Sequence, residues 1–194
     1  MSTRKHFMIG LDAPEDFEKI FEKANTLSEV GMYAEAVPLF ERLYKGHETL
    51  VAPQLGFIYS QEEFEGRNNS IAARYYRVAA ESGDAYSQYA LAGLLRRSGD
   101  PEQAMEWYRR ASSAGHGTAS YMLFQMHRSR GNKSLSEQFF RLAVQQGNPI
   151  AIQRFAIRQT FGRYGIGAIP SGIWTYFSNM RNLLRFVRSH VPRG

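Results

Sequence analysis

The chain has 194 residues, of which 43% are hydrophobic and 22% are charged, and it contains no cysteine. This apolar content is enough for a packed core and excludes an intrinsically disordered chain. The lack of cysteine excludes a disulfide framework, a thiolate metal site and a cysteine nucleophile. No stretch approaches the roughly 18 apolar residues of a transmembrane helix, and the first residues are too poor in apolar side chains for a secretory signal. We therefore expect a cytoplasmic protein.

Charge is distributed unevenly along the chain. The formal net charge is +6, but residues 1–50 carry −3, whereas residues 154–194 carry +7 from seven arginines and no acid. An acidic front and a basic, arginine-only end indicate an anionic partner for the C-terminal part. The alternative is that the basic end only balances the charge of the protein, and the sequence leaves both readings open.

The sequence repeats with a period of 32 residues. Three segments with paired aromatic residues recur at this spacing, and each is followed four residues later by a glycine. These segments are Tyr75-Tyr76-Arg77-Val78-Ala79, Trp107-Tyr108-Arg109-Arg110-Ala111 and Phe139-Phe140-Arg141-Leu142-Ala143, followed by Gly83, Gly115 and Gly147. A weaker copy at residues 39–43 has His47 at the position of the glycine. Such a period indicates stacked units that share one core, with the paired aromatics packed between them.

Within each period the apolar residues recur at helical spacing, as in the stretch 104–111. Asp100 followed by Pro101 is typical of a helix start, and Gly115 is typical of the residue with positive φ just after a helix. We therefore expect helix pairs joined by short turns. The predicted helices span about residues 14–30 and 33–45, 48–62 and 69–82, 84–98 and 101–114, 116–130 and 134–146, and 149–161.

The run Ala104-Met105-Glu106-Trp107-Tyr108-Arg109-Arg110-Ala111 with Gly115 resembles the second helix of Sel-one-like (Sel1-like) repeats, a branch of the tetratricopeptide class. Leu55-Gly56-Phe57-Ile58-Tyr59 and Ala92-Gly93-Leu94-Leu95 resemble the small-residue crossing of the first helix of such repeats. The resemblance covers about residues 15–160. It implies an all-α fold, an α-solenoid of antiparallel helix pairs, that works as an interaction scaffold and not as an enzyme.

The repeat pattern ends after about Phe161. Glycines and Pro170 within residues 162–172 predict a hinge, and residues 1–13 are expected to form an N-terminal arm. Residues 173–191 carry apolar side chains at steps of four and three, which predicts a basic amphipathic helix. Its candidate contacts with a membrane or another anion lie on one flank: Trp174, Arg181, Arg185 and Arg188. Three roles stay open for this helix: a cap on the repeats, a contact with an anionic membrane surface, or docking into a partner.

In helix-pair solenoids the first helix of each pair lines the concave face. An alignment on Gly93 places these residues there: Ser87, Ala90, Leu94 and Arg97, then Met122, Met126 and Ser129, then Arg154 and Arg158. We expect a groove that is apolar in the middle and basic at its C-terminal end, where arginines would grip an acidic protein or peptide. The candidate partner-binding residues are Arg97, Met122, Met126, Arg154 and Arg158.

The sequence shows no pattern of reaction chemistry. The five histidines lack metal-ligand spacing, and Pro170 interrupts the one start of a dinucleotide-binding fingerprint, at Gly165 and Gly167. We therefore predict no catalytic residue, no metal and no cofactor. The favoured function is a scaffold or adaptor for protein partners. The alternatives are a peripheral membrane adaptor anchored by residues 173–191 and an RNA-binding repeat protein, which the acidic first half disfavours.

Overall fold

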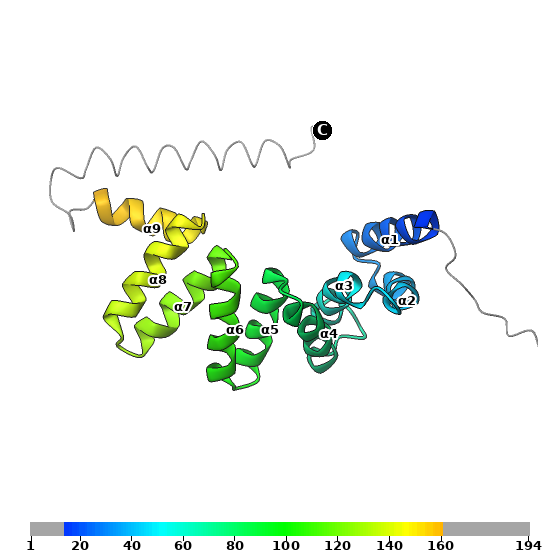
Figure 1. Ribbon diagram of the computed structural model, residues 1–194, viewed down its shortest axis with the longest axis horizontal. Helices are drawn as coiled ribbons and strands as arrows, with labels where there is room; N and C mark the ends of the chain where they lie inside the picture. Colours follow the sequence, from blue (N-terminus) through cyan, green and yellow to red (C-terminus); the bar gives the residue numbers. More distant parts are fainter. Residues whose placement is uncertain (1–13, 161–194) are drawn as a thin grey trace, which may run out of the picture. The chain divides into compact units, whose positions relative to one another are not determined.

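The computed structural model describes residues 14–160, and within this range the chain is helical and has no strand. The helices of this part are, in chain order (Figure 1), α1 (Pro14–Glu29), α2 (Tyr33–Tyr44), α3 (Glu48–Ser60), α4 (Asn69–Glu81), α5 (Ala85–Arg97), α6 (Pro101–Ser113), α7 (Gly117–Ser129), α8 (Lys133–Gln145) and α9 (Pro149–Thr160). Every helix predicted within this range is confirmed, and its ends lie within two residues of the expected positions. None of them is long and apolar enough to cross a bilayer.

Three predicted segments lie outside the described residues. They are the N-terminal arm at 1–13, the glycine-rich hinge at 162–172 and the amphipathic helix at 173–191. The candidate anion or membrane contacts on that helix lie outside as well, namely Trp174, Arg181, Arg185 and Arg188.

The chain divides into two compact units, and the boundary follows Asp100. The first unit contains α1 to α5, and the second contains α6 to α9. Within each unit, every helix packs against the next one along the chain. Sequential packing of this kind is what helix pairs joined by short turns require.

Glycines occupy the turns after most helices, as the repeat predicted. Gly115 follows α6 with φ at 89°, in the left-handed region that side chains with a Cβ rarely adopt. After α2 the residue with this role is Gly46, with φ at 91°, one position before His47, which aligns with the glycine of the later copies. The physical reason is that α2 ends four residues after its buried ring, Phe40, whereas α4 ends five residues after Tyr76.

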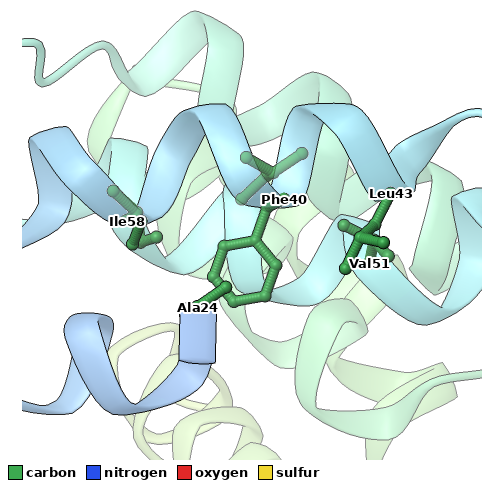
Figure 2. Close-up of a cluster of buried hydrophobic side chains, with 7 residues drawn as sticks. Ala24, Phe40, Leu43, Val51 and Ile58 are labelled. Atoms are coloured by element: carbon green, nitrogen blue, oxygen red, sulfur yellow. The ribbon is translucent and has the colours of Figure 1, made fainter. Parts of the chain in front are cut away.

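One core cluster of the first unit lies between α1, α2 and α3. Phe40 of α2 is fully buried, and its ring meets the ring of Phe21 edge-on with centroids 5.8 Å apart. Figure 2 shows this ring reaching toward Ala24 of α1, with buried aliphatic side chains of α2 and α3 around it. Those side chains are Leu43, Val51 and Ile58.

The predicted small-residue crossing is confirmed at Gly56 of α3. A Cβ on this glycine would lie 2.8 Å from the nearest ring carbon of Tyr76 on α4, closer than van der Waals contact allows. The missing side chain therefore lets the buried Tyr76 ring pack directly against the backbone of α3.

The two rings of each aromatic pair have different positions. The second rings are buried in the unit interior: Tyr76, Tyr108 and Phe140. In two pairs the first ring stacks on the preceding helix, so that Tyr75 lies over Tyr59 with centroids 5.9 Å apart, and Phe139 lies over His127 with centroids 5.3 Å apart. The second ring of each pair therefore faces the interior, as the period predicted, and the first rings of two pairs pack against the preceding helix.

A ring of hydrogen bonds links α6, α7 and the turn after α8. The Ser120 hydroxyl donates to Oε1 of Gln146, and its oxygen lies 2.6 Å from Oγ of Ser112. The side-chain amide of Gln146 donates back to the carbonyl oxygen of Ser112 at 2.7 Å. Because Ser112 and Ser120 are buried, each hydroxyl needs a partner, and the ring provides one for each.

Candidate functional site

The first helices of the pairs in the second unit are α7 and α9, and two contacts join them. The guanidinium of Arg154 on α9 lies over the ring of Tyr121 on α7, 5.7 Å from its centroid. The side-chain amide of Asn148 donates to Oγ1 of Thr118 at 3.3 Å. These contacts place the start and the middle of α9 beside α7.

Side chains at equivalent repeat positions of α7 and α9 form one strip, which is partly buried on α7 and exposed on α9. In each helix they follow the spacing i, i+4 and i+7, and the two sets are 32 residues apart. We call this strip the α7–α9 face, and it consists of Thr118, Met122 and Gln125 on α7 and Ile150, Arg154 and Ile157 on α9. Ile150 and Ile157 are 48% and 43% exposed, although isoleucine is usually buried.

Arg154 is the cation at the centre of the α9 part of this face. The second unit contains three acidic residues within the described range, and each pairs with another arginine. The pairs are Glu102 with Arg130, Glu106 with Arg109 and Arg110, and Glu137 with Arg141 and Arg158. Among residues 14–160, no carboxylate lies within ion-pair distance of Arg154.

The other predicted site residues have different surroundings. Met122 and Met126 of α7 are partly buried, and Arg97 is exposed at the end of α5 in the first unit. Arg158 of α9 is half-buried, donates to Oε2 of Glu137 at 3.1 Å and lies over the Phe140 ring at 4.2 Å. Arg158 is therefore held by an ion pair and a ring contact within the protein, whereas Arg154 has its contact with the Tyr121 ring and no ion pair with residues 14–160.

The predicted position of the binding face on α5 needs a correction. Ser87 and Leu94 were expected to line it, but both are buried. The positions that match the α7–α9 face begin one residue earlier, at Tyr86, which is exposed, and continue through Ala90 to Gly93. One residue corresponds to about 100° around a helix, so Ser87 and Leu94 turn inward.

Sequence reasoning missed Ile150 and Ile157. Apolar residues at helical spacing usually indicate a buried face, so their spacing alone does not mark them as exposed. The repeat alignment could have identified them, because the matching positions one period earlier carry the polar residues Thr118 and Gln125. Polar residues at equivalent positions indicate that this side of the helix faces solvent.

His127 of α7 is a buried ionisable group with a structural position. It is 4% exposed, its ring is parallel to that of Phe139, and neither ring nitrogen has a hydrogen-bond partner. Burial lowers the pKa of His127, and the cations Arg109 and Arg130 lower it further. The imidazole is therefore neutral at pH 7 and fills the stacking position that Tyr59 fills in the first unit. In the described part of the chain, no group of three or more His, Asp or Glu side chains could hold a metal ion.

Comparisons with known proteins agree with this architecture. The family model of the Sel1 repeat matches residues 54–84 and 85–116. A Sel1 repeat protein from Oxalobacter formigenes is 16% identical, with a TM-score of 0.67 over 83% of this chain and 69% of that one. The protein c5321, a protective antigen present in uropathogenic Escherichia coli strains displaying an SLR fold, is also 16% identical, with a TM-score of 0.67. In that case the alignment covers 84% of this chain but only 38% of c5321.

A further similar structure is MamA, with 13% identity and a TM-score of 0.57 over 94% of this chain and 100% of that one. No curated protein matches the sequence. At these identities the likeness shows the fold alone, and it confirms the predicted α-solenoid class of helix pairs.

Proposed function

Because the chain is a Sel1-like repeat protein, we propose that it is a protein-interaction scaffold and not an enzyme, and that a protein or peptide partner binds to its α7–α9 face. Repeat solenoids present extended surfaces formed by equivalent positions of successive units, and binding commonly uses these surfaces. The α7–α9 face is such a surface within the second unit.

The observation that carries the proposal is the composition of this face. Two exposed isoleucines, Ile150 and Ile157, lie on the same side of α9 with Arg154 between them. A single exposed apolar side chain is ordinary, but an apolar pair around an arginine at the equivalent positions of a repeat is typical of an interaction surface. Met122 adds a flexible side chain that adapts to irregular partners.

The remaining candidate residues support the proposal to different degrees. Met126 and Arg158 occupy the next equivalent position, at the border of the α7–α9 face. Since Arg158 already forms an ion pair with Glu137, we propose that it lies at the border of the face and does not contact the partner. Arg97 belongs to the first unit and is proposed as a separate contact.

The test is co-purification of the tagged full chain from its native cells, with two variants that add the same charge. I157E places a carboxylate on the α7–α9 face, and Q138E places one on the exposed side of α8. Both residues are exposed, so both variants should keep the thermal stability of the parent. We expect Q138E to recover the partner normally and I157E to lose it. Equal recovery by the two variants would show that partners do not bind to this face.

A further inference from the structure

We infer that the ligand of the α7–α9 face is a linear peptide segment that places a carboxylate on Arg154 and an apolar side chain on each side of it. This inference rests on the proposed function and adds the chemical class of the partner. It follows from three observations about Arg154. They concern its N–H donors, the possible sources of a carboxylate that could bind them, and its apolar neighbours.

The first observation is that Arg154 has unused hydrogen-bonding capacity. Its guanidinium lies 5.7 Å from the centroid of the Tyr121 ring, and among residues 14–160 no acceptor takes a hydrogen bond from its N–H groups. A carboxylate is the planar acceptor that matches the fork of these donors. The equivalent residues of the two preceding repeats are Ala90 and Met122, so neither of them carries a cation at this position.

The second observation concerns where a carboxylate could come from. Glu137 is the last acidic side chain in the sequence, and it already pairs with Arg141 and Arg158. Residues 138–194 therefore contain no Asp or Glu that could fold back onto Arg154. No acidic side chain of residues 14–160 pairs with Arg154 and none exists in residues 138–194, which favours an acidic partner over the basic C-terminal part of the protein itself.

The third observation is the spacing of the two isoleucines. Ile150 lies four residues before Arg154 and Ile157 three residues after it, which corresponds to about 6 Å and about 4.5 Å along the helix axis. Alternate residues of an extended peptide, about 7 Å apart, lie on one face of the peptide. We therefore expect ligand sequences with an Asp or Glu and an apolar residue within four positions on both sides.

The experiment is selection of phage-displayed random 12-residue peptides on the immobilised full chain. Enriched peptides are then synthesised and titrated by fluorescence anisotropy against the parent chain, R154Q and R128Q. Arg128 is the matched control, because it is also exposed, lies over a ring (Phe124, 6.0 Å) and is not one of the residues of the α7–α9 face. We expect enriched peptides to share the acidic and apolar pattern. R154Q should weaken their binding by about tenfold or more, as expected when a hydrogen-bonded charge is removed, while R128Q leaves it unchanged.

Replacement of the peptide carboxylate by its amide should cause the same loss, and the two changes together should cause little further loss, because they remove one interaction. Enriched peptides without an acid, or equal effects of R154Q and R128Q, would overturn the inference and leave the scaffold function standing. Failure to enrich any peptide would also overturn it, and the I157E co-purification then decides the scaffold function separately. Self-association of the parent chain in sedimentation that R154Q abolishes would also overturn the inference, because a second copy of the chain would then occupy the face.

Discussion

Replacement of Phe140 by Ala should strongly destabilise the second unit, because this one ring contacts the helices on both sides of α8. The ring is fully buried, and its centroid lies 5.2 Å from that of Phe124 on α7 and 6.5 Å from that of Phe155 on α9. The guanidinium of Arg158 lies over it at 4.2 Å. F140A therefore removes the contact between three helices and the platform of Arg158 together.

The magnitude follows from the buried area. A phenylalanine ring buries about 150–250 Å², which at about 25 cal/mol per Å² is worth about 4–6 kcal/mol, and the alanine methyl recovers a small part. Core Phe-to-Ala changes cost about 3–5 kcal/mol, so we expect about 4 kcal/mol for F140A. F140L keeps most of the volume and should cost about 1.5 kcal/mol or less.

The assay is urea unfolding followed by circular dichroism, together with hydrogen exchange of the backbone amides of α7, α8 and α9. Hydrogen exchange is needed because stacked repeats do not have to unfold in a single step. We expect a lower unfolding midpoint and faster exchange in these three helices, while the exposed control Q138A behaves like the parent. An F140A protein within about 1 kcal/mol of the parent, well below the core range, would refute the packing described for the second unit.

Three further predictions concern pH, polar contacts and the C-terminal part. The pKa of His127 is lower in the folded chain than its ordinary 6.5, so the unfolded chain binds the proton more readily, and stability should fall as the pH drops below about 6.5. H127Y, which copies Tyr59, should flatten that dependence in urea titrations at several pH values; an unchanged slope would contradict the assignment. Q146A opens the hydrogen-bond ring with Ser112 and Ser120 and should cost about 1–3 kcal/mol in thermal unfolding, and no loss would mean that water replaces the ring. If residues 173–191 anchor the chain to anionic membranes, the full chain should float with anionic liposomes and a chain ending at residue 172 should not; equal flotation would exclude that anchor.

The sequence predicted the helices well because their ends depend on local signals. A glycine with positive φ, such as Gly115, and a proline at the first helical position, such as Pro101, act within a few residues. The inward position of the aromatic pairs was predictable for the same reason, since the apolar period marks the buried side.

The candidate site was only partly predictable, because its chemistry depends on contacts between distant residues. The sequence ranked Arg154 and Arg158 together, and only the fold shows that Glu137, 21 residues before Arg158, engages one of them. Likewise, Ser87 was placed on the binding face because an alignment cannot fix the rotation of a helix to better than one residue. Ile157 was not identified from the sequence, because its exposure depends on what packs against α9.

The most direct test of the partner-binding face is site-specific photo-crosslinking in the native cells. A photoreactive phenylalanine analogue is placed at position 157, on the α7–α9 face, or at position 138, on the exposed side of α8. The account predicts a discrete crosslinked partner from position 157 that is absent from position 138 and is lost when Arg154 is changed to Gln. Crosslinks from position 138 alone, or a product at position 157 that does not depend on Arg154, would contradict it.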